Sequence, residues 1–335
     1  MSNKEIGISE IAEALGISST TVSRAISGNG RVSEETKAAV AAYIAENKIT
    51  PRIRRNNYTN KKTMNIGVCL PSEGDYAEMP FFTKILMTLY DYFSVRGYNI
   101  ILLRTAQWEI SALKNAVNHH IVDGVVLTRV FENGIDIQFL KEKGVPFVVV
   151  GTYEDEEVYQ VDVDQRGACR ELASILFKMG IRKTALMSAN FTQGVIQSRM
   201  NGYLDAVREN DMPIEHKFLI ENAADANVME KAVMDIVREG IECIICTDDG
   251  ICISVLNYLR ELGIRVPEDI RIASYYNSSV LEEQTLAVTS IDFDICEWGK
   301  IAGLMLEKQL LGEPGEKRKQ MGHKILLKES TKFSL

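Results

Sequence analysis

From Thr63 onward, short apolar runs alternate with longer segments in which apolar residues recur every three or four positions. The first pattern predicts buried β-strands and the second predicts amphipathic helices, and their alternation is typical of parallel sheets with helical crossovers. Strands are expected at 64–70, 98–103, 123–128, 146–150, 184–189, 217–220, 242–247 and 270–275. Helices are expected near 81–96, 110–120, 135–143, 166–179, 195–210, 227–239 and 250–262.

Two successive series of this strand–helix unit are separated at VDVD, residues 161–164. They predict an α/β core, residues 63–335, of two lobes that are each a doubly wound parallel sheet. The tail adds one helix (295–311) and one strand (323–328), which lets the chain return and complete both lobes. We expect a ligand cleft between the lobes, at the carboxyl ends of the strands. The expected lobes are about 63–161 plus 292–320 and about 162–291 plus 321–335.

Residues 1–50 show a different pattern, that of three short helices. Ser9, Ser18 and Ser33 stand where these helices would begin, and a serine caps a helix by accepting a hydrogen bond from a free main-chain amide. Gly16 supplies the left-handed residue that a tight turn between the first two helices requires. The segment is therefore expected to be an all-α helix-turn-helix domain.

The second helix has a polar outer face suited to DNA. Ser19, Thr20, Ser23 and Arg24 are small or hydrogen-bonding, and no acidic residue lies among them. A helix in the major groove must approach the base edges closely, so this composition favours a recognition helix. Arg24 would bond a guanine or neutralise a phosphate. The alternative is an ordinary capped surface helix.

Charge is distributed unevenly along the chain. Residues 1–62 hold 10 Lys and Arg against 6 Asp and Glu, a net of +4, whereas the remainder holds 28 against 40, a net of −12. The stretch 51–62, PRIRRNNYTNKK, contains five basic residues and no acidic one, and we interpret it as a hinge. This asymmetry indicates that the N-terminal part alone meets a polyanion.

Several other classes of protein are disfavoured. No apolar run is long enough to span a membrane, and the N-terminus does not resemble a secretion signal, so a cytoplasmic location without membrane contact is expected. Cys243 and Cys246 form a C-x-x-C, but residues three apart on a strand point to opposite faces, which argues against a metal or redox role. The chain lacks a phosphate-binding loop, a nucleophile elbow and metal-spaced histidines, so we expect neither an enzyme nor a cofactor.

The chain resembles the lactose-repressor (LacI/GalR) family of transcription regulators. The resemblance begins with Thr21-Val22-Ser23-Arg24, Gly28-Asn29 and Val32-Ser33-Glu34-Glu35-Thr36. It continues in family order through the following motifs: Pro80-Phe81-Phe82, Val122-Asp123-Gly124, Gly144-Val145-Pro146, Val163-Asp164, Arg199, Gly202-Tyr203, Asp248-Asp249 and Gly263-Ile264-Arg265-Val266-Pro267-Glu268-Asp269. It implies a helix-turn-helix headpiece on a two-lobed, periplasmic-binding-protein-like core.

The family resemblance also implies partners. They are a near-palindromic double-stranded operator, a small-molecule effector such as a sugar, and a second copy of the chain in a homodimer. In the mechanism it implies, the effector moves one lobe against the other and thereby changes the operator affinity of a repressor, by roughly 5–150-fold. The rival interpretations are an α/β enzyme and a two-lobed sugar-binding protein without a regulatory role.

The resemblance assigns a set of residues to DNA. In the family, the segment after the headpiece becomes a short helix on the operator and inserts an apolar wedge into the minor groove. Pro51 suits the first turn of such a helix. Tyr58 stands here at the wedge position, where leucine is usual, so the alternative of a solvated basic linker without a wedge stays open. The expected DNA-binding residues are Ser9, Ser18, Ser19, Thr20, Thr21, Ser23, Arg24, Asn29, Arg52, Arg54, Arg55 and Tyr58.

The resemblance also assigns residues to the effector: Phe81, Phe82, Asp164, Arg199, Asp248 and Asp249. Aromatic rings cover the apolar face of a sugar, and Arg and Asp bond adjacent hydroxyls. Simpler interpretations remain, because Phe81 or Phe82 would also serve as core and Asp249 as a helix cap. The chain departs from the family at Tyr275-Tyr276-Asn277, where an aspartate pair is common, and Tyr276 is added as a residue that would stack on the ligand.

Overall fold

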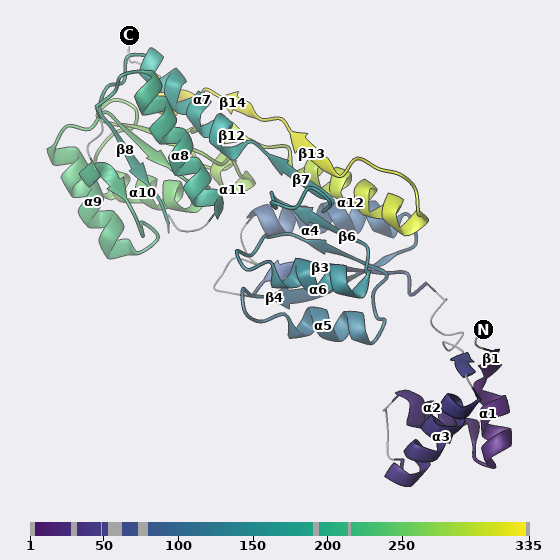
Figure 1. The fold of residues 1–335 in the computed structure, drawn as a ribbon. Helices are drawn as coiled ribbons and strands as arrows, with labels where there is room; N and C mark the ends of the chain where they lie inside the picture. Colours follow the sequence, from purple (N-terminus) through teal and green to yellow (C-terminus); the bar gives the residue numbers. More distant parts are fainter. Residues whose placement is uncertain are drawn as a thin grey trace. The chain divides into compact units, whose positions relative to one another are not determined.

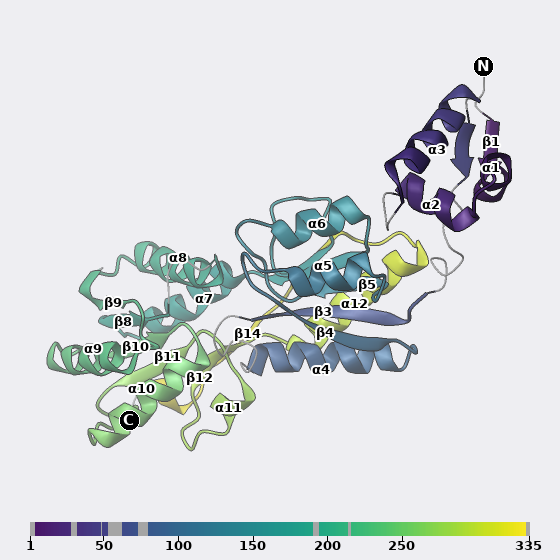
Figure 2. The same ribbon diagram turned by 90° about the horizontal axis from the view of Figure 1, so that it is seen from below.

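The computed structural model describes residues 4–27, 32–47, 49–52, 62–72, 80–189, 194–213 and 216–332. The chain divides into two compact units, Met1–Lys62 and Thr63–Leu335. Both are drawn in Figures 1 and 2, and each is described by itself below.

The first unit contains the three expected helices, α1 (Ile8–Leu15), α2 (Ser19–Ser27) and α3 (Glu34–Glu46). Their common core is small and apolar, with the side chains of Ile11, Ala12, Val22 and Val40 at its centre. Gly16 has a φ of +65°, so the turn between α1 and α2 uses the left-handed conformation that glycine adopts without strain.

Two of the three predicted helix caps are present. The Ser18 hydroxyl accepts a hydrogen bond from the Thr21 amide at 3.1 Å, and the Ser33 hydroxyl accepts one from the Thr36 amide at 3.2 Å. The prediction for Ser9 is wrong, because α1 already begins at Ile8. Strand β1 (Lys4–Gly7) runs directly into this helix and leaves no capping position at Ser9.

The first unit is also not purely helical. β1 pairs in parallel with β2 (Ile49–Arg52), with Lys4 opposite Ile49. Pro51 therefore lies in a short strand here and does not begin a helix. The β-branched residues Ile49 and Thr50 favour extended backbone, and proline is tolerated in a strand at a sheet edge.

The second unit is built on two sheets, as the sequence predicts, and each has six strands. The first has the order β13-β7-β6-β5-β3-β4, and all its pairs are parallel. Its strands are β3 (Asn65–Pro71), β4 (Asn99–Thr105), β5 (Gly124–Leu127), β6 (Phe147–Val150), β7 (Gln160–Val163) and β13 (Arg318–Met321). Helices α4 (Pro80–Ser94), α5 (Ser111–Asn118), α6 (Ile135–Lys143) and α12 (Ile295–Leu311) cover it (Figure 1).

Alternating side chains give this sheet two buried faces. Val68 and Val126 pack with α4 and α12, whereas Val125 and Leu127 pack with α5 and α6. Two strands of this sheet, β7 and β13, were not expected from the sequence. β7 lies in this sheet, between β6 and β13, and β13 consists of the polar residues Arg-Lys-Gln-Met, which carry no strand pattern.

The second sheet has the order β14-β12-β11-β10-β8-β9. Its strands are β8 (Thr184–Met187), β9 (Leu219–Ile220), β10 (Cys243–Cys246), β11 (Arg271–Ser274), β12 (Thr289–Asp292) and β14 (Lys324–Leu326). β14 pairs with β12 in the antiparallel direction, and the other pairs of this sheet are parallel. Helices α7 (Gln165–Lys178) and α8 (Gly194–Glu209) lie on one face (Figure 2), and α9 (Ala226–Arg238) and α10 (Asp249–Glu261) on the other.

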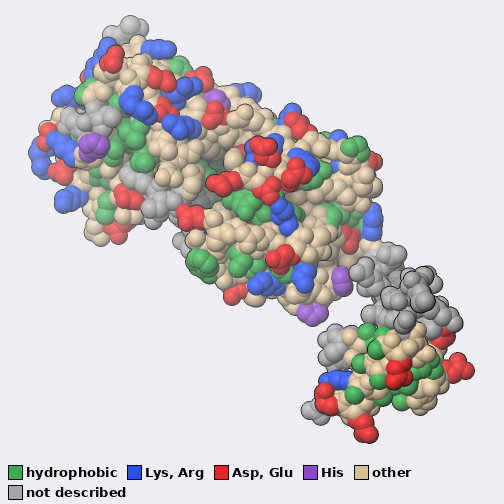
Figure 3. Space-filling view, in the orientation of Figure 1, with side chains coloured by type: hydrophobic (Ala, Val, Ile, Leu, Met, Phe, Trp, Pro, Cys, Tyr) green, Lys and Arg blue, Asp and Glu red, His purple; other side chains and the backbone are tan. Residues whose placement is uncertain are grey.

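The short helix α11 (Ser279–Glu282) follows β11. The main chain passes from one sheet to the other three times, after β7, after β12 and after β13. Among the described residues, no helix is both long and apolar enough to cross a membrane. On the face of the second unit seen in Figure 3, acidic and basic side chains are interspersed with one another.

Candidate functional site

The candidate DNA-binding surface is α2 of the first unit. Ser18, Ser19 and Arg24 are exposed, and Thr21 is half-buried. The hydroxyls of Ser18 and Thr21 are also joined by a hydrogen bond of 2.7 Å, which fixes both at the start of the helix. A helix start with polar side chains and an exposed arginine one turn later has the chemistry that major-groove contact requires.

The remaining predicted DNA contacts are only partly described. Ser9 lies on α1, Thr20 and Ser23 lie on α2, and Arg52 is the last residue of β2. The structure describes only the main chain of these four residues. Asn29, Arg54, Arg55 and Tyr58 lie outside the described residues. Their assignment to DNA stays a prediction.

The second candidate site is centred on Arg199, which is on α8 and only 8% exposed. Its Nε donates a hydrogen bond to Oε1 of Gln165 at 3.0 Å, and its Nη1 donates one to the main-chain oxygen of Thr247 at 2.5 Å. Gln165 begins α7 and Thr247 follows β10, so both partners stand just beyond the end of a strand. The guanidinium is thereby fixed at the carboxyl edge of the second sheet.

Carboxylates surround this guanidinium. Burial raises the pKa of Asp248, and the positive charge of Arg199 opposes the rise. Burial also raises the pKa of Asp162, and there a hydrogen bond from Thr152 and the charge of Arg199 both oppose it. Arg199 therefore helps two half-buried carboxylates from separate strand ends to stay charged.

Asp248 and Asp249 stand at the start of α10. Asp248 caps the helix, with its Oδ1 accepting a hydrogen bond from the Ile251 amide at 2.9 Å. The capping role that the sequence suggested for Asp249 therefore belongs to its neighbour. Asp249 is 3% exposed, and its charge adds to the effect of burial in raising the pKa of Tyr276.

Tyr276 follows β11 and is 7% exposed. The Ser274 hydroxyl donates a hydrogen bond of 2.7 Å to the main-chain oxygen of Tyr276 and thereby fixes the main chain of Tyr276. Four of the predicted effector residues, Arg199, Asp248, Asp249 and Tyr276, thus gather at one edge of the second sheet. They present hydrogen-bonding groups and one aromatic ring, which suits a ligand with many hydroxyl groups.

The other predicted effector residues lie elsewhere. Phe82 is 9% exposed and packs into the core under α4. Phe81 stands edge-on to Phe82 and to Trp298, with ring centroids 5.0 and 5.5 Å apart. These contacts fit the core interpretation of Phe82, whereas Phe81 is half-buried and keeps part of its ring accessible.

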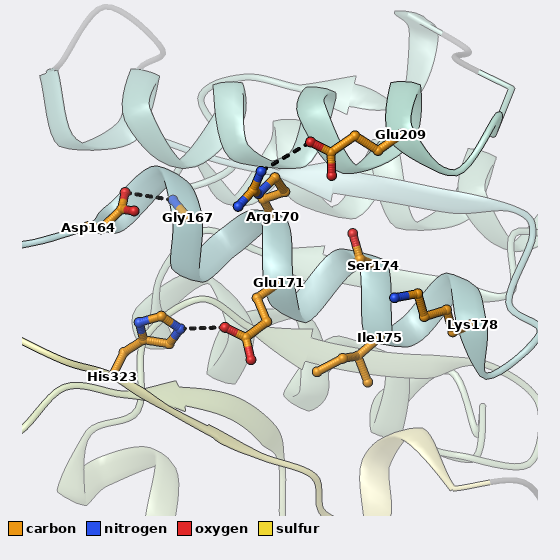
Figure 4. Close-up of a pocket in the computed structure, with 9 residues that line it drawn as sticks. All are labelled: Asp164, Gly167, Arg170, Glu171, Ser174, Ile175, Lys178, Glu209 and His323. Atoms are coloured by element: carbon orange, nitrogen blue, oxygen red, sulfur yellow. Dashed lines mark hydrogen bonds and ion pairs between the residues drawn. The ribbon is translucent and has the colours of Figure 1, made fainter.

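Asp164 caps α7 and lines a different, shallow hollow (Figure 4). Its Oδ1 accepts a hydrogen bond from the Gly167 amide at 2.7 Å. The hollow has a volume of about 530 Å³ and runs along the exposed face of α7, where Glu171 pairs with His323 at 2.9 Å. Asp164 is thus a capping residue in this structure, and Asp162, two positions earlier, is the carboxylate near Arg199.

Three residues of the Arg199 cluster were missed by sequence reasoning: Asp162, Gln165 and Thr247. The signal was available for Thr247, which ends the expected strand 242–247, because ligands of doubly wound sheets bind at the carboxyl ends of the strands. Asp162 lies in β7 and Gln165 just after it, and the sequence did not predict that strand. Cys243 and Cys246, in contrast, are buried at the two ends of β10, and burial raises the pKa of both thiols, as expected of inert core cysteines.

Comparison with known proteins gives two family matches. Residues 7–51 match bacterial regulatory proteins of the lacI family, and residues 173–331 match the periplasmic binding protein-like domain. The chain is 25% identical over 340 residues to catabolite control protein A of Priestia megaterium, covering 98% of this chain and 99% of that protein. It is 24% identical over 293 residues to the HTH-type transcriptional regulator MalR of Staphylococcus xylosus, covering 86% of each.

Solved structures show the same fold. A transcriptional regulator CelR–cellobiose complex superposes with a TM-score of 0.72 at 24% identity, covering 96% of this chain and 99% of that one. A LacI family transcriptional regulator from Enterococcus faecium with bound ribose has a TM-score of 0.69 at 20% identity, covering 79% and 98%. The expected two-part architecture is therefore confirmed.

Proposed function

Because the chain is a member of the lacI family of bacterial regulatory proteins, we propose that it is a sequence-specific transcriptional repressor controlled by a carbohydrate effector. The observation that carries this proposal is the coexistence in one chain of a capped helix-turn-helix and the buried Arg199 cluster. The first has the chemistry to bind duplex DNA, and the second the chemistry to bind a polyhydroxylated molecule. A two-lobed sugar-binding protein without a regulatory role would have no use for the first.

The effector binds between the lobes, against the Arg199 cluster. Two relatives of the same fold are named with cellobiose and with ribose, which supports a sugar as the ligand class. Arg199 contacts Gln165 at the start of α7 and Thr247 beyond β10. A ligand that bonds the Arg199 guanidinium therefore displaces elements at the junction of the two lobes. The effector thereby favours one relative arrangement of the lobes and changes operator affinity.

The protein acts as a homodimer on two half-sites of a near-palindromic operator. The dimer forms through a face made by α4 and the edge strand β4. Met87, Tyr90 and Leu102 are each 52% exposed on this face, and apolar side chains grouped on adjacent elements mark a protein-binding surface. Because its target is DNA, the protein works in the cytoplasm, and binding rather than catalysis is its activity.

Selection of duplexes from a random pool by the purified full chain tests this function. The selected duplex should bind far more tightly than an unrelated duplex of equal length, and binding should weaken steeply with salt. A fragment of residues 63–335, the second unit by itself, is the matched control and should bind neither duplex. Equal affinity of the full chain for both duplexes would leave the sugar-binding protein as the better interpretation.

A further inference from the structure

Trp108 is an exposed indole at the tip of a tight turn between β4 and α5. It is 77% exposed, whereas Trp298, the other tryptophan of the chain, is 4% exposed. The main chains of Ala106 and Glu109 exchange two hydrogen bonds, of 2.8 and 3.1 Å, that leave only Gln107 and Trp108 at the tip. An indole is a large apolar surface, so covering it with a ligand releases much water.

The turn is held from two sides. Nδ2 of Asn133, in the loop before α6, donates a hydrogen bond to the main-chain oxygen of Gln107 at 2.5 Å. The Glu109 carboxylate accepts a hydrogen bond from the Ser111 amide at 2.6 Å, at the start of α5. Trp108 therefore stands on a pre-organised support, which reduces the entropy lost when a ligand covers the ring.

The position of this turn relates it to the effector site. Thr105 ends β4 opposite Pro71 at the end of β3, and the Ser72 amide donates to the Thr105 oxygen at 2.9 Å. β3 lies between β4 and β5 in the sheet, and Asn133 lies in the loop that follows β5. Because the turn after β4 is bonded to Asn133, it lies over the carboxyl end of β3. Trp108 is therefore at the carboxyl edge of the first sheet, the edge at which ligands of such sheets bind.

We propose that Trp108 stacks on a second sugar ring, so that the effector is a disaccharide or longer oligosaccharide. The inference rests on the proposed function. The polar cluster around Arg199, apart from Asp162 in β7 of the first sheet, belongs to the second lobe and bonds the hydroxyls of one ring. The exposed indole belongs to the first lobe and covers the apolar C–H face of the next ring, and closure of the lobes brings both surfaces onto one ligand.

Tryptophan fluorescence of the unmodified protein gives the first test. Acrylamide quenches an exposed indole and hardly reaches a buried one, so quenching reports Trp108 and leaves Trp298 nearly silent. Cellobiose and maltose are the disaccharide probes and glucose is the single-ring control. We expect quenching to fall when one of the disaccharides saturates the protein and to stay unchanged with glucose. Equal protection by glucose and by both disaccharides would overturn the proposal.

Variants give the second test. Trp108→Ala should weaken binding of the protective disaccharide about tenfold and leave glucose binding unchanged, while Trp108→Phe should retain most of the affinity. If Trp108→Ala abolished the dimer, and quenching of the unmodified protein were already low before any sugar is added, Trp108 would lie in a subunit contact and the proposal would be overturned.

The sugar panel separates this inference from the proposed function. If glucose raises the melting temperature and neither disaccharide binds more tightly than glucose, the second-ring inference fails while a carbohydrate effector stands. If no sugar of a broader panel changes the melting temperature or the operator affinity, the carbohydrate effector itself fails, and the second-ring inference fails with it.

Discussion

The Arg199 guanidinium donates a 2.5 Å hydrogen bond to the main-chain oxygen of Thr247, the residue that follows β10. Through this bond and the one to Gln165, a single buried cation connects α8, the end of β10 and the start of α7. A ligand that bonds Arg199 therefore acts on three elements at once. This connection is the physical basis of the coupling that we propose between effector and operator.

Replacing Arg199 should abolish the response to effector. Arg199→Ala removes a cation whose charge acts on both Asp162 and Asp248 and leaves the Thr247 oxygen without its donor. A sugar that raises the melting temperature of the unmodified protein should no longer do so, while operator affinity without sugar stays within about threefold.

Arg208→Ala is the matched control for this change. Arg208 lies on the same helix, but its side chain is 68% exposed and pairs with Asp205, one turn away. It should keep the full sugar-induced rise in melting temperature, measured by differential scanning fluorimetry. An Arg199→Ala protein that still responds to sugar would remove this cluster from the effector site.

The first unit should depend on Arg24 for DNA binding and on Ser33 for stability. Arg24→Ala removes an exposed cation from α2 and should weaken operator binding about 5–150-fold, a loss of about 1–3 kcal/mol, with the melting temperature unchanged. Ser33→Ala should instead destabilise the head by about 1 kcal/mol, because the Thr36 amide loses its acceptor.

Fluorescence anisotropy on a labelled operator measures the Arg24 effect, and thermal unfolding of the isolated residues 1–62 measures the Ser33 effect. Lys37→Ala, on the exposed side of α3, is the control for a loss of positive charge by itself. If Lys37→Ala and Arg24→Ala weakened binding equally at every salt concentration, α2 would not be the recognition helix.

How far the sequence predicts the structure depends on how local each signal is. The strands and helices expected at particular residues between 64 and 328 and the caps at Ser18 and Ser33 follow from short stretches of chain, and they are confirmed, whereas β7, β12 and β13 were not predicted. β13 was missed because Arg318-Lys319-Gln320-Met321 becomes a strand only by pairing with distant β7. Ser9 was assigned as a cap because nothing local shows that β1 continues directly into α1.

The candidate site was predicted in part for the same reason. Motif resemblance located Arg199, Asp248 and Asp249, whereas Gln165 and Thr247 enter the site through hydrogen bonds between elements far apart in sequence. Asp164 shows the limit of a motif match, since its side chain caps α7 and the carboxylate near Arg199 is Asp162. In a continuous strand residues 162 and 164 would share a face, but β7 ends at Val163 and Asp164 already caps α7, so only the fold decides which one faces the site.

Asp136 should make stability depend on pH. Its side chain is 1% exposed, Oδ2 lacks a hydrogen-bond partner among the described residues, and burial raises the pKa of the carboxyl to about 6. Because the folded-state pKa lies above the unfolded value, the native state gains stability as pH falls from about 7 toward 4 and loses that gain as pH rises through 6.

Asp136→Asn should therefore stabilise the protein at neutral pH, by up to about 3 kcal/mol, and show no advantage near pH 4. Urea unfolding at pH 7.5, 6 and 4.5 measures the difference, where these pH values bracket the raised pKa. Asp91→Asn, at an exposed position of α4, is the control and should change little at any pH. A destabilised Asp136→Asn protein at pH 7.5 would show that the carboxylate has a partner in solution.

The proposed dimer face gives a direct prediction of subunit state. Leu102→Asp places a charge at the centre of the face that α4 and β4 form, and should convert the dimer into monomers at micromolar concentration. Leu311→Asp, at a residue with a similar 56% exposure at the end of α12, should leave the dimer intact. Sedimentation equilibrium distinguishes the two variants, and a dimeric Leu102→Asp protein would exclude this face.

The most direct test of the account is the affinity of the full chain for its selected operator, measured by anisotropy with and without a sugar that raises its melting temperature. We predict a change of roughly 5–150-fold in the dissociation constant, present in the unmodified protein and absent in Arg199→Ala. The same operator affinity with and without a bound sugar, in the unmodified protein, would contradict the coupling between the Arg199 cluster and the helix-turn-helix.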